Sequence, residues 1–246
     1  MANRVRGSRS KKDIRERDKM TATEELLETP EALQDRIVDT EEYIKQHSTP
    51  FIIGAAAIVL AVAGYFGYHY YQDSQNQTAQ EEMFQAIYYF ESDSLNAALN
   101  GDGNNYGFLE IIDEFGGTDA ANLAHYYSGI IELRQGNYES AIEYLEDFGA
   151  SDLLVQAQAY ALIGDAYMEL GDHQQAASQY EKAADYNTNQ FFSPQYLAKA
   201  GVAYEAAGDY GSAAASYQRI IDEFPQAYEF QEAQKQQARL EALATK

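Results

Sequence analysis

Residues 160–183 read YALIGDAYMELGDHQQAASQYEKA, and residues 197–220 read LAKAGVAYEAAGDYGSAAASYQRI. In both segments a second glycine follows the first after seven residues, and an alanine follows the second glycine after five. A weaker copy upstream keeps this spacing at Gly129, Gly136 and Ala141, so the first glycines of successive copies are 35 and 37 residues apart. Self-similarity at this period indicates a row of helical units that bury their apolar faces against one another.

The spacing within each copy has a physical reason. The first glycine lets a partner helix approach closely, and the second ends a helix in a left-handed turn that other residues adopt only at a cost. The Asn or Asp that follows can cap the next helix, and the alanine lies where two helices cross. In chain order these positions are Gly129, Gly136, Asn137 and Ala141, then Gly164, Gly171, Asp172 and Ala176, then Gly201, Gly208, Asp209 and Ala213.

These copies closely resemble the tetratricopeptide repeat. The second copy has nearly the whole motif, namely Tyr160, Ile163, Gly164, Tyr167, Gly171, Ala176, Tyr180 and Ala183. The third has Ala200 where a larger residue is usual, and the first has Glu132 and His125 in place of aromatic residues. The resemblance implies an all-α solenoid with three repeats over residues 119–226 and a solvating helix over residues 227–246.

The same resemblance implies a protein-binding groove, because the first helices of such repeats line a concave surface. The residues expected there are Leu123, Tyr126, Ile130, Leu133 and Arg134, then Gln158, Ala161, Asp165, Met168 and Glu169, then Gln195, Ala198, Val202, Glu205 and Ala206. This surface would be apolar at one end and acidic at the other, without a Lys or Arg clamp for a peptide carboxylate. Its ligand would be an extended or partly unfolded chain. Alternatively, the groove is only a solvated surface or is filled by the chain's own C-terminal helix.

A second feature is the uncharged segment Phe51–Tyr71, FIIGAAAIVLAVAGYFGYHYY. Its first 18 residues are apolar or small, and at about 1.5 Å per residue they would span about 27 Å, close to the hydrocarbon thickness of a bilayer. Aromatic residues crowd its C-terminal end, as in an interfacial belt. We therefore expect a transmembrane helix over residues 50–71. The alternative is a buried helix of a soluble core, and a cleaved signal peptide does not fit a run that begins 50 residues into the chain.

The distribution of Lys and Arg predicts the orientation of this helix. Ten of them precede the apolar segment, and the first one after it is Arg134. The positive-inside rule therefore places residues 1–50 in the cytoplasm and residues 72–246 on the far side of the membrane, which the chain crosses once.

Four small residues, Gly54, Ala57, Ala61 and Gly64, share one stripe of the predicted transmembrane helix. Small residues allow helices in a bilayer to pack closely. The stripe is therefore either a packing face for another transmembrane helix or a consequence of composition alone.

Three flanking regions complete the predicted organisation. Residues 1–28 form a basic cytoplasmic tail that is expected to be disordered. Residues 29–49 form a short amphipathic helix that either contacts a partner or only leads into the membrane. Residues 72–118 form a helical stalk and an atypical capping repeat, with the helix from the membrane continuing to about Glu91.

Composition and motifs argue against catalysis, metal binding and nucleic-acid binding. The chain has no cysteine, which excludes thiol catalysis and cysteine-based zinc sites, and its net charge of −22 argues against nucleic-acid partners. The sequence has no phosphate-binding loop and no hydrolase or zinc-protease motif. The four histidines are dispersed, and Asn100–Asn105 lacks the spacing of a calcium loop. We expect a protein that is not an enzyme, without catalytic, cofactor or metal residues and without a small-molecule substrate.

The complete layout adds a further resemblance. A short cytoplasmic tail, one N-terminal anchor and an acidic periplasmic repeat domain are similar to the YfgM-like ancillary subunits of the Sec translocon, in a Bacteroidota-type form. This resemblance implies a non-catalytic protein whose partners are Sec translocon subunits, periplasmic chaperones and exported polypeptides. The alternatives are an envelope scaffold for cell division or outer-membrane assembly, and a catalytic or metal-dependent envelope protein.

Overall fold

The computed structural model describes residues 48–244, and every regular element in this range is a helix. The all-α fold class predicted from the sequence is confirmed. The predicted basic tail (1–28) and nearly all of the predicted amphipathic helix (29–49) lie outside the described residues. The chain divides into two units between Tyr68 and His69, and each is described by itself.

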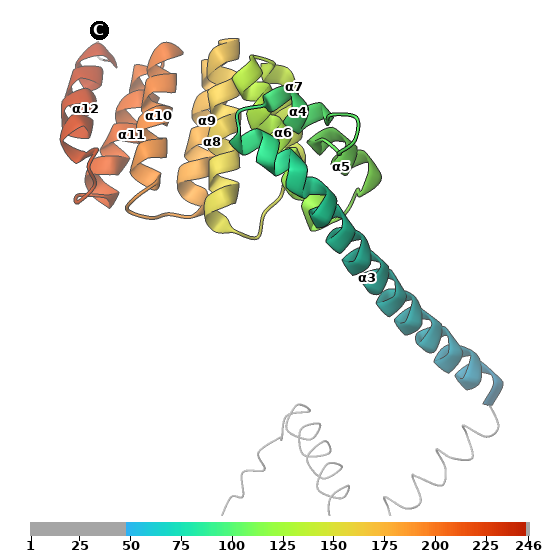
Figure 1. The fold of residues 1–246 in the computed structure, drawn as a ribbon. Coiled ribbons are helices and arrows are strands. Elements are labelled where there is room, and N and C mark those ends of the chain that lie inside the picture. The colour runs from blue at the N-terminus through green and yellow to red at the C-terminus, as the bar shows by residue number, and fades with distance from the viewer. Residues whose placement is uncertain (1–47, 245–246) are drawn as a thin grey trace, which may run out of the picture. The chain divides into compact units, whose positions relative to one another are not determined.

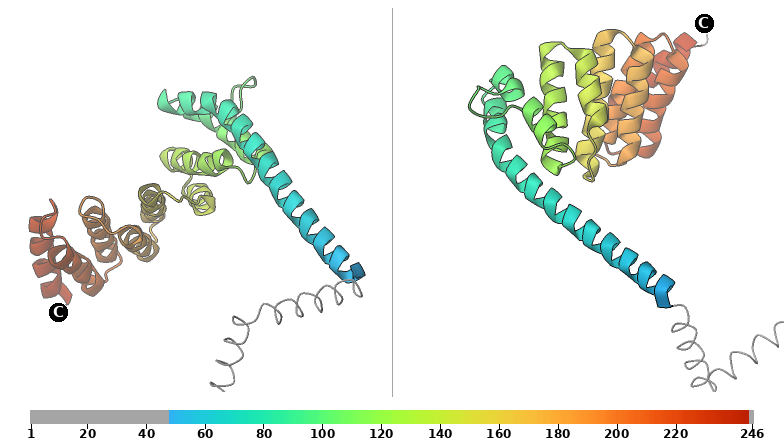
Figure 2. Two further views of the ribbon diagram at one scale, coloured as in Figure 1. Left: turned by 90° about the horizontal axis from the view of Figure 1, so that it is seen from below. Right: turned by 90° about the vertical axis from the view of Figure 1, so that its right-hand side faces the viewer.

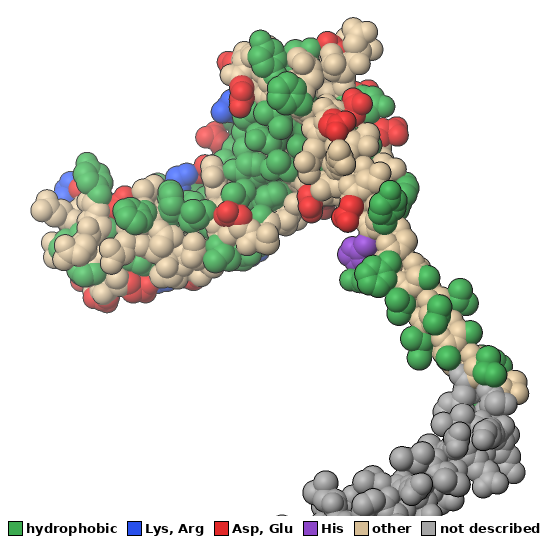
Figure 3. Space-filling model, turned by 60° about the horizontal axis from the view of Figure 1, so that its bottom comes forward, with side chains coloured by type: hydrophobic (Ala, Val, Ile, Leu, Met, Phe, Trp, Pro, Cys, Tyr) green, Lys and Arg blue, Asp and Glu red, His purple; other side chains and the backbone are tan. Residues whose placement is uncertain are grey.

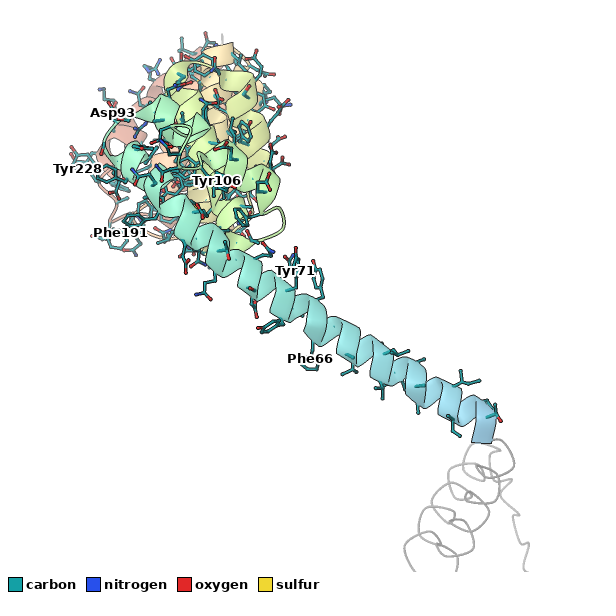
Figure 4. All side chains as sticks on the ribbon, turned by 45° about the vertical axis from the view of Figure 1, so that its right-hand side comes forward. Phe66, Tyr71, Asp93, Tyr106, Phe191 and Tyr228 are labelled. Carbon is teal, nitrogen blue, oxygen red and sulfur yellow. The ribbon has the colours of Figure 1, made fainter. Side chains whose placement is uncertain are left out.

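The apolar segment forms the first part of α3 (Ser48–Glu91), a continuous helix of 44 residues. Its large apolar side chains between Ile52 and Val62 are 48–72% exposed, and Phe66 and Tyr71 also project outward from the helix (Figure 4). Among the described residues, α3 is the helix that is long and apolar enough to cross a membrane. No residue of its most apolar window is buried, whereas those of a core helix would be.

The second unit is a row of helices in which each packs against the next along the chain from α4 to α12 (Figures 1 and 2). Two short helices, α4 (Leu95–Asn100) and α5 (Phe108–Glu114), follow α3. The pairs that come next are α6 (Asp119–Gln135) with α7 (Tyr138–Asp147), α8 (Leu153–Leu170) with α9 (His173–Tyr186), and α10 (Ser193–Ala206) with α11 (Tyr210–Glu223). The helix α12 (Phe230–Ala244) follows the last pair.

The first core of this unit joins the end of α3 to the repeats. Ala79, Met83 and Ala86 of α3 are buried with Phe108 and Ile111 of α5 and with side chains of α4 and α6. The side chain of Asn76 adds a polar contact, because its Oδ1 accepts the backbone N–H of Ala120 at 3.0 Å. The helix that contains the apolar segment therefore continues, without a break, into the core of the capping region.

Each helix pair is held together at the position of its first glycine. A Cβ on Gly164 would lie 2.7 Å from the ring of Tyr180, and a Cβ on Gly201 would lie 2.6 Å from the ring of Tyr217. In the first pair, a Cβ on Gly129 would lie 2.5 Å from Leu145. These distances are too short for real Cβ contacts. The expectation that glycine permits close approach of the paired helices is therefore confirmed.

The second glycines also have the predicted conformation. The backbone φ angles of Gly136, Gly171 and Gly208 are 84°, 79° and 79°, in the left-handed region that favours glycine. The expected caps follow in two of the three pairs, where Asp172 accepts the N–H of Gln175 and Asp209 accepts the N–H of Ser212.

The cap prediction is wrong for Asn137. Its side-chain amide makes no capping hydrogen bond, and its Nδ2 instead donates to Glu132 at 2.6 Å. Glu132 is only 9% exposed, so its carboxylate needs a nearby donor. Glu132, the acidic residue of the degenerate first copy, therefore binds the side chain of Asn137, the residue predicted to cap α7.

The substitution Gly164→Ala tests the close approach in the α8–α9 pair. The added methyl group would collide with the buried ring of Tyr180, and such overpacking costs about 1–3 kcal/mol. Gly211→Ala is the matched control, because a Cβ there would make only an ordinary contact, 3.6 Å from Oδ1 of Asp209. Urea unfolding of the full chain in detergent, followed by circular dichroism, should show a lower midpoint for Gly164→Ala alone. Equal midpoints for the two variants would contradict this packing.

Candidate protein-binding groove

An open pocket of about 410 Å³ lies on the first helices of successive repeats. Its walls come from α8, α10 and α12, and its floor comes from α9 and α11. Apolar residues predominate, and we call it the apolar pocket. It is lined by Met168, Tyr180, Gln195, Ala198, Lys199, Val202, Tyr217, Ile220, Glu229, Glu232, Ala233 and Gln236.

A neighbouring pocket of about 420 Å³ shares Met168 and Tyr180 with the first. It is lined by Leu133, Tyr138, Asp165, Met168, Glu169 and Tyr180, and we call it the acidic pocket. The two pockets together extend from α6 to α12 and form the candidate groove. One face of the repeat domain also shows hydrophobic side chains gathered at its middle, with Asp and Glu side chains around them (Figure 3).

Part of the predicted groove lines these pockets. Gln195, Ala198 and Val202 line the apolar pocket, and Met168 lines both. The acidic pocket contains three further predicted residues, Leu133, Asp165 and Glu169.

Two of the predicted groove residues are placed differently. Tyr126 is only 8% exposed and packs in a core with Leu145 and Phe148, its ring centroid 5.0 Å from that of Phe148. Ile130 is partly buried against the same core. The assignment of Tyr126 to the groove surface is therefore wrong.

The reason lies in an exchange of large and small residues between paired helices. In the second and third repeats the first helix has a small residue, Ala161 or Ala198, and the second helix has a large one, Tyr180 or Tyr217. At the equivalent positions of the first repeat, the first helix has the large Tyr126 and the second helix has the smaller Leu145. Because Leu145 fills less space than a tyrosine, Tyr126 turns inward and completes the core.

Six other predicted groove residues lie outside both pockets, namely Leu123, Arg134, Gln158, Ala161, Glu205 and Ala206. Of these, Ala161 is only 4% exposed and belongs to the core, so its assignment to the groove surface is wrong. Gln158 is exposed. The guanidinium of Arg134 lies 5.1 Å from the ring centroid of Phe90 and 3.7 Å from the carboxylate of Asp93. Glu205 accepts two hydrogen bonds, of 2.8 and 2.6 Å, from the guanidinium of Arg239 in α12.

The sequence analysis missed a cation in the groove. The Nζ atom of Lys199 donates to both carboxylate oxygens of Asp165, at 2.7 and 3.0 Å, and lies 5.3 Å from the ring centroid of Tyr180. The hydroxyl of Tyr180 also donates to Asp165, at 2.5 Å. Burial, reinforced by Asp165, raises the pKa of Tyr180 well above its usual value, so the phenol stays protonated and remains a donor.

A shared spacing could have revealed this pair. Lys199–Asp165, Arg219–Asp185 and Arg239–Glu205 are all ion pairs whose members are 34 residues apart. That separation is close to the repeat length, so each pair joins equivalent faces of successive repeats. Such partly exposed pairs contribute little to stability, because water screens their charges, but they favour one register between neighbouring helix pairs.

The C-terminal helix forms a wall of the groove and does not fill it. Ala233 and Leu240 of α12 are 1% and 0% exposed in the last core, while Glu229 and Gln236 line the open apolar pocket. The alternative in which the chain's own helix fills the groove is therefore wrong.

Within residues 48–244, no group of three or more His, Cys, Asp or Glu side chains could hold a metal ion. Residues 101–105, directly after α4, form a turn in which Asp102 accepts the backbone N–H groups of Asn104 and Asn105. The hydroxyl of Tyr89 donates to the same carboxylate at 2.7 Å. These hydrogen bonds hold the pKa of Asp102 well below its usual range, that from Tyr89 contributing most.

Comparison with protein families agrees with this architecture. The tetratricopeptide repeat matches residues 110–152 and 161–228. The second unit therefore has the fold of a tetratricopeptide-repeat solenoid. No curated protein matches the sequence. Such repeats are protein-interaction modules, and the two pockets lie on the surface that the family geometry assigns to ligands.

The Glu205–Arg239 pair gives a pH-dependent prediction. Hydrogen bonds from Arg239 lower the pKa of Glu205, so the stabilisation is present above the usual Glu pKa and is lost as the pH falls through the lowered value. Arg239→Gln should lower the free energy of unfolding only slightly near pH 7, because both side chains are partly exposed and water screens their charges. The difference from wild type should shrink towards about pH 3.

Lys235→Gln is the control, since Lys235 contacts Glu232 only within α12, and both side chains are largely exposed. Urea unfolding at the two pH values should show almost no change for this variant. A pH-independent effect of Arg239→Gln would mean that lost packing, and not the ion pair, explains its destabilisation.

Proposed function

We propose that this chain is a non-catalytic, membrane-anchored protein that binds other polypeptides in the groove of its repeat domain. The supporting observation is the pair of open pockets between α6 and α12, which lie on the first helices of the repeats and remain accessible beside α12. The exposed apolar part of α3 supports the anchor, since side chains of this kind are stable in hydrocarbon and costly in water.

The orientation proposed for the anchor puts residues 1–50 in the cytoplasm and the repeat domain in the periplasm of a bacterial inner membrane. The support is the asymmetry of the charges, because the nearest basic residue after the apolar segment is Arg134.

Within this function, the role we propose is that of an ancillary subunit of the Sec translocon. The groove would receive exported polypeptides or recruit periplasmic chaperones, and the Gly54–Gly64 stripe would pack against translocon subunits. The support is the resemblance in layout described above. The stripe is also exposed within this chain, with open space around Gly54 and Gly64. A scaffold for cell division or outer-membrane assembly is the competing role.

Photo-crosslinking from α3 would separate these roles. A photoreactive residue at Ala57 lies on the stripe, whereas one at Val59 lies on the opposite face of the same helix and serves as control. We expect adducts with translocon subunits from Ala57 and not from Val59, because only the stripe allows close helix packing. Adducts only with division or outer-membrane machinery would favour the competing role. Identical adducts from both positions would contradict a packing face.

A further inference from the structure

The apolar pocket is a hollow large enough to receive an apolar side chain. Its volume of about 410 Å³ lies within the range of about 300–1,000 Å³ that is usual for ligand pockets. Val202 is 51% exposed on its wall, beside Met168 and above the buried rings of Tyr180 and Tyr217. An apolar side chain from a partner would remove this surface from water.

Acidic residues stand on both sides of this pocket. Glu229 and Glu232 lie at its α12 side, and Asp165 and Glu169 lie in the adjoining acidic pocket. Lys199 is the only Lys or Arg that lines either pocket, and its charge is already paired with Asp165. The lining of the two pockets thus has four carboxylates and one ammonium, a net charge of −3.

The positions of these acids suggest which of them are open to a ligand. The carboxylate of Asp165 already accepts hydrogen bonds from the hydroxyl of Tyr180 and from Nζ of Lys199, both shorter than 3.0 Å. Glu169 has a weaker contact, 3.4 Å from the hydroxyl of Tyr138, and it is exposed. A guanidinium or ammonium that reached Glu169 would gain a charged partner without breaking the Asp165–Lys199 pair.

From this arrangement we infer that the groove takes an extended segment of another protein in which an apolar side chain is flanked by Lys or Arg. The inference rests on the proposed function of the groove and adds the chemistry of its occupant. The apolar residue enters the apolar pocket, and the basic residues pair with Glu169 on one side and with Glu229 on the other, since Glu232 already contacts Lys235 and Gln236. An acidic segment would meet uncompensated carboxylates on both sides.

Charge also disfavours a second copy of this chain as occupant. Residues 72–246 hold 28 Asp or Glu and only seven Lys or Arg, so two repeat domains repel each other at moderate salt. The chain's own basic segment, residues 1–20 with a net charge of +5, has suitable charge but lies across the membrane in the proposed orientation.

Fluorescence anisotropy with the full chain in phosphatidylcholine nanodiscs tests this inference. Three labelled peptides of equal length would carry Leu flanked by Lys and Arg, Leu flanked by Glu, and Ser flanked by Lys and Arg. We expect the first to bind about tenfold more tightly than either of the others, a difference of about 1.4 kcal/mol. Its affinity should fall as salt is raised.

Two groove variants with matched controls locate the binding. Val202→Asp should weaken the first peptide about tenfold, because it places a charge in the apolar pocket. Leu154→Asp is its control, since Leu154 is similarly exposed, at 46%, but lines neither pocket. Glu169→Gln should weaken binding about threefold and flatten the salt dependence. Glu143→Gln, an exposed acid of α7 outside the pockets, should change neither.

The possible failures are distinguishable. One outcome is that the peptide with Leu flanked by Glu binds as tightly as the basic one, or more tightly, and loses its affinity in Val202→Asp. That result would agree with the groove as a binding site and overturn the preference for basic flanks. Binding of all peptides that is unaffected by Val202→Asp would overturn the groove as their site. Tighter binding of a peptide of residues 1–20, or a concentration-dependent dimer abolished by Val202→Asp, would identify the chain itself as occupant and overturn the inference. The crosslinks from α3 report on the translocon role independently.

Discussion

The repeat domain depends on the close contact between a glycine on the first helix of a pair and a large buried side chain on the second. In the α8–α9 pair the ring of Tyr180 occupies the space that any side chain at position 164 would need. The ring is therefore 3% exposed, and its hydroxyl reaches Asp165 on the partner helix. Because Tyr180 also lines both pockets, one side chain fixes the packing of the pair and forms part of the groove.

The same packing explains why the groove stays open. The second helices bury their aromatic residues beneath the first helices, which leaves one face of α8 and α10 without a covering helix. Ion pairs between successive repeats, such as Lys199 with Asp165, then link these faces side by side. The ion pair between Arg239 of α12 and Glu205 of α10 places the C-terminal helix next in the row. This helix therefore extends the wall of the groove instead of closing it.

The spacing of glycine and aromatic residues predicted the helix pairs. The glycine on the first helix and the large residue that contacts it on the second helix both recur along the sequence. The geometry implied by the resemblance to the tetratricopeptide repeat also placed Met168, Val202 and Glu169 in the groove. It failed at Tyr126, where the large residue of the contact has moved from the second helix to the first, because the inward turn of that ring depends on how the core is packed. It missed Lys199 because the partner of that residue, Asp165, lies one repeat away. Local spacing carries no information about such contacts between repeats.

The central claim is that the groove holds other polypeptides on the periplasmic side of the membrane. Photo-crosslinking in living cells from position 202, inside the apolar pocket, tests it most directly, with position 154 as the reference outside the pockets. The account predicts adducts with exported or periplasmic polypeptides from position 202 that are absent from position 154. Adducts with cytosolic proteins, or the same adducts from both positions, would contradict it.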